Sequence, residues 1–226
     1  MTDRDNQHWL RMWRNEQTDF HQQAVNPLLV RFWTSFAPKK HSRIFVPLCG
    51  KSLDLLWLAQ QGNEVVGVEL SPIAMKAFFE ENALIPHKRK QGKFSVWQSG
   101  RVKILCGDFF SLTRADLGEI DVVYDRAALT ALPEDIRRRY VSHLRDIVPL
   151  TCSIFLLTIE DAKPTCQSSL LSVTGNEVDE EIIALYERYF VIDIAHVEPA
   201  WESDPAHPGE GAVAVEHKVY RLLPRA

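Results

Sequence analysis

Short runs of apolar, mostly β-branched residues alternate in the middle of the chain with segments whose apolar residues recur every three or four positions. The first pattern is typical of buried strands and the second of amphipathic helices. Together they predict strands at 43–47, 64–68, 120–124 and 153–159, and helices at 51–61, 71–82, 133–148 and 177–189. Such alternation is typical of βαβ units, so we expect a mostly parallel, twisted sheet with helices on both faces.

Two parts of the pattern depart from this alternation. Residues 94–97 and 102–106 flank Ser99-Gly100 and predict a pair of strands joined by a turn. Residues 190–196 and 212–222 predict two closing strands with no helix between them, as in an antiparallel hairpin at a sheet edge. The segment 198–211 between them is rich in proline and glycine, so we expect an irregular surface loop there.

The part of the chain ahead of the first strand, residues 5–37, predicts a helical segment rich in aromatic residues. Because no repeat or linker interrupts the chain, we expect one domain over 1–226. It would consist of an N-terminal helical extension or lid at 1–40 and an α/β core at 41–226. Five aromatic residues at helical spacing are expected in the core: Trp33, Phe36, Trp57, Phe78 and Phe79.

Composition and charge narrow the classes of function. The chain has 226 residues, 46% hydrophobic and 25% charged, which is enough to bury a sizeable core. The net charge of −4 argues against a nucleic-acid-binding protein, and the basic run at 87–93 lacks interleaved aromatics, so we expect a solvated loop there. The sequence has no run of eighteen apolar residues and no secretory signal pattern. We therefore expect a cytoplasmic protein that does not associate with a membrane. We also expect a monomer. No CxxC pair occurs, so no metal site is expected.

Candidate chemistry lies at the carboxyl ends of the predicted strands, where open α/β sheets bind ligands. The first strand runs into a tight turn at Gly50, which permits close backbone approach to a ligand. The second strand ends at Glu69, where a carboxylate is suitably placed to accept the hydroxyls of a ribose. The strand at 120–124 leads into Asp125 and Arg126. Asp125 also suits a structural role, accepting backbone N–H groups at the strand end.

The type of nucleotide follows from what the first turn lacks. Gly50 is the one glycine of this turn, so the three-glycine pattern G-x-G-x-x-G is missing; the turn offers no crossing point for a pyrophosphate and disfavours a dinucleotide-dependent oxidoreductase. S-adenosylmethionine needs a ribose-binding acid without a pyrophosphate cradle. An antiparallel strand at the end of the sheet is also usual in class I methyltransferases.

Several longer stretches make a family recognisable: FVPLCGKSLDLLWLAQQGNEVVGVELS at 45–71, CGDFF at 106–110, YDRAAL at 124–129 and WLRMW…FHQ at 9–22. Over about residues 7–150 the chain closely resembles thiopurine S-methyltransferase of the bacterial type. The resemblance implies a Rossmann-like class I methyltransferase fold, with a mostly parallel seven-stranded sheet and an antiparallel C-terminal strand. It also implies methyl transfer from S-adenosylmethionine to a small aromatic or heterocyclic thiol by direct in-line displacement.

The resemblance also assigns site residues, position by position. It implies cofactor binding by Trp13, Leu48, Gly50, Glu69, Asp108, Phe109 and Arg126. It implies acceptor-side aromatics at Phe20 and Trp9. Arg126 would also position an anionic acceptor, and no dedicated base is expected because acidic thiols are already ionised near neutral pH.

The resemblance fades after about residue 160, where 161–173 and the loop before the last strand depart from the family pattern. Both departures lie on the acceptor side, so the alternatives to a thiol acceptor stay open. One alternative is a methyltransferase for selenium or tellurium compounds. Another is a non-catalytic nucleotide-binding module.

Overall fold

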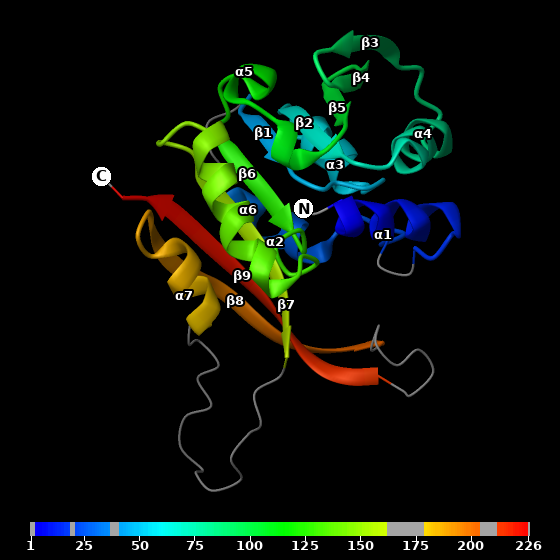
Figure 1. The fold of residues 1–226 in the computed structure, drawn as a ribbon. Coiled ribbons are helices and arrows are strands. Elements are labelled where there is room, and N and C mark those ends of the chain that lie inside the picture. The colour runs from blue at the N-terminus through cyan, green and yellow to red at the C-terminus, as the bar shows by residue number, and fades with distance from the viewer. Residues whose placement is uncertain (1–2, 19–20, 37–40, 162–178, 204–211, 226) are drawn as a thin grey trace, which may run out of the picture.

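A computed structural model describes residues 3–18, 21–36, 41–161, 179–203 and 212–225. Its centre is one sheet with strand order β3-β4-β5-β2-β1-β6-β7-β9-β8 (Figure 1). Five strands in the middle are parallel: β5 (Val102–Cys106), β2 (Glu64–Glu69), β1 (Arg43–Val46), β6 (Val122–Arg126) and β7 (Ser153–Asp161). The expected parallel core and the helices on both of its faces are confirmed.

The sheet ends on both sides in antiparallel strands. On one side lie β4 (Phe94–Ser99) and β3 (His87–Gln91), and on the other β9 (Ala212–Pro224) and β8 (Phe190–Ser203). The predicted pair at 94–97 and 102–106 and the predicted C-terminal hairpin are therefore confirmed. The described sheet has nine strands, however, and not the expected seven.

Helices cover both faces of the sheet, and each face has its own buried core. One face packs against α2 (Pro27–Phe36), α3 (Asp54–Gln60) and α4 (Pro72–Glu81). The other packs against α5 (Arg114–Leu117), α6 (Glu134–Ile147) and α7 (Glu180–Tyr186). Figure 1 shows α6 and α7 in front of the sheet. No helix in the described part of the chain has both the length and the apolar character needed to cross a bilayer.

The basic run at 87–93 was expected to be a solvated loop, but its first five residues form the edge strand β3. Lys88 places its ammonium group 3.6 Å from the centre of the Trp97 ring on β4, a cation–π contact. The strand has no hydrophobic alternation because its side chains are mostly exposed and only one of its edges is paired. Residues 87–91 are therefore a strand because their backbone pairs with β4, and their side-chain pattern does not predict it.

The expected loop at 198–211 is also partly wrong, because β8 continues to Ser203 and pairs with β9 up to Ala212. Pro199 lies within this pairing, opposite Glu216. A proline is tolerated here because β8 is the last strand of the sheet and its outer edge needs no donor. The tip of the hairpin, 204–211, lies outside the described residues.

The N-terminal extension contains two helices with different surroundings. α2 packs into the core, with Leu29 and Trp33 buried against the sheet. The predicted core positions of Trp33, Phe36, Trp57, Phe78 and Phe79 are confirmed: three are buried, while Phe36 and Trp57 are partly buried against the same cluster. α1 (Asp3–Arg14) instead lies next to the carboxyl end of β6 (Figure 1).

Candidate functional site

A cavity opens at the carboxyl ends of β1, β2 and β6, and α1 covers it. It is lined by Trp9, Trp13, His21, Leu48, Cys49, Gly50, Lys51, Ser52, Glu69, Leu70, Arg126, Ala127, Ala128, Ala131 and Leu132. Six of the residues implied by the resemblance meet here: Trp9, Trp13, Leu48, Gly50, Glu69 and Arg126. The structure thus gathers residues from three strand ends and one helix around one space.

The turn after β1 has an unusual backbone. Leu48 and Gly50 both adopt left-handed conformations, with φ of +46° and +54°. Such a φ costs a non-glycine residue energy, and strained positions of this kind gather at functional sites. The N–H of Cys49 donates to the carbonyl of Val68 on β2, which holds the turn against the neighbouring strand. The Trp13 ring lies beside Gly50, where an added Cβ would be 3.4 Å from it.

Glu69 connects the turn after β1 to the loop after β2. One carboxylate oxygen accepts the N–H of Gly50 at 2.8 Å and the other accepts the N–H of Ser71 at 2.7 Å. The side chain is 6% exposed, and burial raises its pKa to about 7 against the opposing effect of these hydrogen bonds. A carboxylate oxygen accepts more than one hydrogen bond, so Glu69 keeps capacity for ligand hydroxyls on its cavity side.

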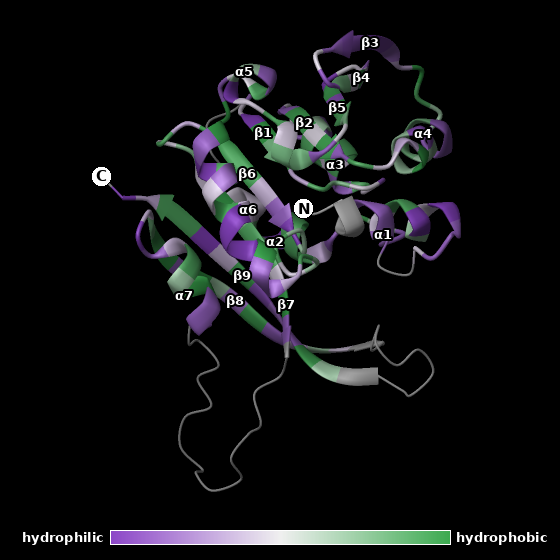
Figure 2. Cartoon of the chain, in the orientation of Figure 1, coloured by the Kyte–Doolittle hydropathy of each residue, from purple (hydrophilic) through white to green (hydrophobic). Residues whose placement is uncertain are grey.

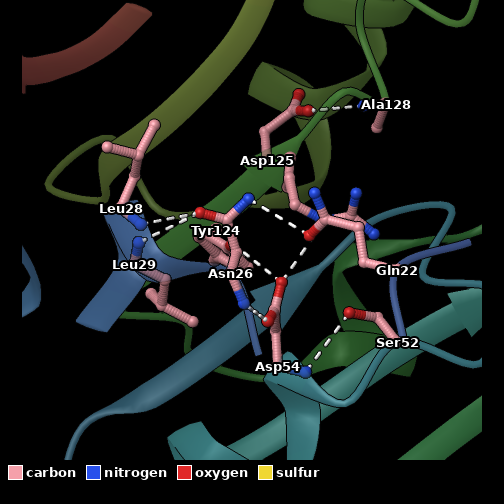
Figure 3. A network of polar contacts seen from close by, with 10 residues as sticks. Gln22, Asn26, Leu28, Leu29, Ser52, Asp54, Tyr124, Asp125 and Ala128 are labelled. Atoms are coloured by element: carbon pink, nitrogen blue, oxygen red, sulfur yellow. Dashed lines mark hydrogen bonds and ion pairs between the residues drawn. The ribbon is translucent and has the colours of Figure 1, made fainter. Parts of the chain in front are cut away.

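Arg126 is held by a buried carboxylate on α3. Its Nε lies 3.3 Å from Oδ2 of Asp54, and the same oxygen accepts the hydroxyl of Tyr124 at 2.9 Å. The other oxygen of Asp54 accepts the backbone N–H of Asn26 at 2.8 Å (Figure 3). Asn26 in turn caps α2, because its side-chain oxygen accepts the N–H of Leu28. This network ties Arg126 to the start of α2 and fixes where its guanidinium lies in the cavity wall.

Asp125, although adjacent to Arg126, belongs to the opposite face of the sheet. Its carboxylate accepts the Tyr140 hydroxyl at 2.6 Å and the backbone N–H of Ala128 at 3.1 Å, and it points away from Asp54 (Figure 3). Burial raises its pKa to about 6. The structural role considered for Asp125 is confirmed. Figure 2 shows that β6 is hydrophobic at its start and hydrophilic at its carboxyl end, where Asp125 and Arg126 lie.

Asp108 and Phe109 lie near the cavity but do not line it. Asp108 caps the short 3₁₀ turn Phe109–Ser111 through the N–H of Phe110, and it lies 3.4 Å from the side-chain amide of Asn6 on α1. Phe109 is buried in the core, with its ring centre 4.9 Å from that of Tyr140. Their assignment to cofactor binding stays a prediction. Phe20 lies outside the described residues, as do residues 162–173 of the divergent segment 161–173 and residues 204–211 of the divergent loop before the last strand.

Three polar side chains of the cavity wall, Lys51, Ser52 and His21, were not among the predicted site residues. Lys51 follows Gly50 and pairs with Glu81 on α4 at 2.7 Å. His21 lies on the loop between α1 and α2, and burial is the largest cause that lowers its pKa. Spacing gave no signal for His21, since no other histidine, cysteine or acid stands near it in a catalytic pattern. It did fall within the FHQ match to the family.

The chain matches the family model described as "Thiopurine S-methyltransferase (TPMT)" over residues 4–225. It is 59% identical over 222 residues to the thiopurine S-methyltransferase of Stutzerimonas stutzeri, covering 98% of this chain and 92% of that protein. It is 37% identical over 219 residues to that of Nitrosospira multiformis, covering 97% and 98%. The similarity therefore extends well beyond the expected 7–150 and does not end near residue 160.

Two solved methyltransferase structures have a similar fold. One from Anabaena variabilis, described as a SAM-dependent methyltransferase, has a TM-score of 0.60 at 13% identity, covering 96% of this chain and 94% of that one. A Burkholderia thailandensis 1,6-didemethyltoxoflavin-N1-methyltransferase, solved with S-adenosylhomocysteine, has a TM-score of 0.58 at 13% identity, covering 96% and 87%. At such low identity these likenesses show the fold alone, and the fold is the expected one.

Proposed function

Because this chain belongs to the thiopurine S-methyltransferase family, it is a methyltransferase that uses S-adenosylmethionine, and we propose that its acceptors are small aromatic or heterocyclic thiols. The observation that carries the proposal is the single cavity in which Glu69, Arg126 and two tryptophans meet. When bound, S-adenosylmethionine supplies an electrophilic methyl group on a sulfonium centre. The chain's part is to bind, orient and exclude water.

The cavity fits such a cofactor on three points. The buried Glu69 carboxylate suits a pair of ribose hydroxyls. Gly50 next to it has no Cβ, so a ligand can approach the backbone closely. Trp13 lies against that glycine and offers an aromatic face to a cation. The positive charge of Lys51 in the turn is paired with Glu81, so the turn does not favour a phosphate group. We therefore assign cofactor contact to Trp13, Leu48, Gly50 and Glu69.

The opposite wall of the cavity suits a flat apolar acceptor. The segment after β6 contributes only small or aliphatic side chains, at Ala127, Ala128, Ala131 and Leu132. Arg126, at the edge of this wall, would hold an anionic sulfur or carboxylate of the acceptor. With sulfur and methyl carbon aligned in this space, transfer proceeds by in-line displacement, and positioning and desolvation supply most of the acceleration.

A panel of acceptors tests the proposal. Purified protein, incubated with methyl-labelled S-adenosylmethionine, is expected to label thiopurines and aryl thiols in preference to selenite and tellurite. The physical reason is the apolar wall after β6, which gains contact area from an aromatic ring and none from a small oxyanion. Transfer to selenite or tellurite alone would instead favour the metalloid alternative, and cofactor binding without any transfer would favour a binding module.

We also propose that α1 with its following loop, residues 5–22, is a lid over the bound cofactor. Trp9 and Trp13 line the cavity from α1, and the side-chain amide of Asn6 on the same helix lies 3.4 Å from the carboxylate of Asp108. Active-site lids belong to the less stable parts of a fold and close on ligand. Amides of α1 are expected to gain protection from hydrogen exchange when S-adenosylhomocysteine is added, measured by mass spectrometry.

The amides of α2 are the internal control for the lid, because that helix is packed into the core and should show no change. Equal protection of α1 with and without ligand would make it a fixed part of the fold.

A further inference from the structure

His21 is a titratable side chain of the cavity wall to which the proposed function so far gives no role. It lines the same cavity as Arg126 and Ala127 and is half-buried. Its backbone N–H donates to the carbonyl of Thr18 at 2.8 Å, so a local turn fixes its position. Within the part of the chain that the structure describes, its ring makes no hydrogen bond. A histidine so placed has ring nitrogens to offer to a ligand.

Burial, more than the charges that face it, lowers the pKa of His21 and keeps its ring neutral near pH 7. Burial lowers its pKa most, followed by Lys51 and, more weakly, Arg126, whereas Glu81 and Asp54 raise it. Both cations are themselves paired, Lys51 with Glu81 at 2.7 Å and Arg126 with Asp54 at 3.3 Å. The net result is a pKa below the usual 6.5. A neutral imidazole carries one unprotonated nitrogen and accepts a proton.

We propose that His21 is a catalytic proton acceptor, which takes the S–H proton from acceptors that enter the cavity as neutral thiols. This inference rests on the proposed thiol acceptor. As the S–H bond breaks, the proton moves to the free ring nitrogen of His21, and the electron pair left on sulfur forms a bond to the methyl carbon. The bond from that carbon to the sulfonium sulfur breaks, and its electrons stay on the sulfur of S-adenosylhomocysteine. The imidazolium then releases its proton to water.

Such a base extends the range of acceptors. An acidic aryl thiol is ionised at pH 7 and needs no help, in agreement with the expectation of no dedicated base for that class. A thiol with a pKa near 9 is only about 1% ionised at pH 7. For that class the thiolate is the nucleophile, and a base at the site of reaction produces it where it is needed.

The test measures methyl transfer by the variants His21→Gln and His21→Asn, whose side chains keep polar atoms but do not titrate. Two classes of thiol are compared as acceptors, neutral thiols with a pKa near 9 and acidic thiols with a pKa near 5. For a thiol of pKa near 9, kcat/KM at pH 7 is expected to fall by at least about tenfold, within the range typical of general bases. For a thiol of pKa near 5 it should stay within about twofold. His87→Gln, on the exposed edge strand β3, is the matched control. Melting temperature and S-adenosylhomocysteine affinity report whether both variants fold and bind.

The pH profile gives a second, independent measurement. With the neutral thiol, kcat/KM of the unaltered protein should rise through the low pKa of His21 and then level off. In the variants it should keep rising toward the pKa of the thiol. Equal losses for both thiol classes, or a profile of the unaltered protein that follows the thiol, would overturn the role of His21. If the unaltered protein methylated no thiol, the proposed function itself would fall and this inference with it.

Discussion

Replacing Glu69 with alanine is expected to weaken S-adenosylhomocysteine binding by at least tenfold. The carboxylate is buried at the cavity wall and, in our proposal, accepts the two ribose hydroxyls. Hydrogen bonds to a charged acceptor contribute about 1.5–3 kcal/mol each, and tenfold in affinity is about 1.4 kcal/mol. Titration calorimetry with S-adenosylhomocysteine measures the change directly.

The same variant loses two contacts within the protein, because Glu69 accepts the N–H groups of Gly50 and Ser71. Its melting temperature should therefore fall as well, and affinity must be measured below the start of unfolding. Glu64→Ala is the matched control, since Glu64 begins the same strand, is exposed and pairs only with Arg43 at the surface. An affinity unchanged by Glu69→Ala would rule out the ribose assignment.

The raised pKa of Glu69 adds a pH dependence to this prediction. Without ligand the group titrates at about 7. Ribose hydroxyls that donate to the carboxylate favour its charged form, so the pKa in the complex is lower than in the free protein. Affinity is then full above pH 7 and decreases as pH falls below 7 toward the pKa of the complex. The decrease should be present in the unaltered protein and absent in Glu69→Ala.

The sequence pattern was sufficient for the parallel core and for part of the site. Gly50 and Glu69 were predicted because a turn after a buried strand and an acid at the end of the next strand are local features. The edge strand β3 and the continuation of β8 beyond residue 196 were not, because β3 has mostly exposed, charged side chains and that part of β8 contains Pro199. Both exist through backbone pairing with a neighbour, which single-sequence periodicity does not report.

The partner of Arg126 shows a second limit. Asp125 is the acid next to Arg126 in the sequence, yet successive side chains of a strand point to opposite faces of the sheet. Tyr124 and Arg126 therefore share one face and both contact Asp54, which is 72 positions from Arg126. Asp125 faces Tyr140 on the other side. Only the folded arrangement of α3 against β6 reveals this pairing, because nothing local in the sequence relates Asp54 to either residue.

Replacing Arg126 with lysine is expected to lower kcat for an acidic aryl thiol by more than tenfold, while S-adenosylhomocysteine affinity stays within a few-fold. Lysine keeps the charge but lacks the planar guanidinium and the Nε–H that lies near Asp54. A tenfold loss of rate corresponds to about 1.4 kcal/mol of transition-state stabilisation. Steady-state kinetics and calorimetry on the same preparation separate turnover from cofactor binding. Arg139→Lys, on the exposed side of α6, is the matched control.

Asp54→Asn completes the argument, because it leaves Arg126 in the chain and removes only the charge that holds it. If the position of the guanidinium matters for the acceptor, this variant should repeat the loss of kcat seen in Arg126→Lys. It should also melt at a lower temperature, since Asp54 accepts from Asn26 and Tyr124 as well. A parallel fall in S-adenosylhomocysteine affinity in Arg126→Lys would instead assign the guanidinium to the carboxylate of the cofactor. Turnover in Arg126→Lys equal to that of the unaltered protein would end the acceptor role.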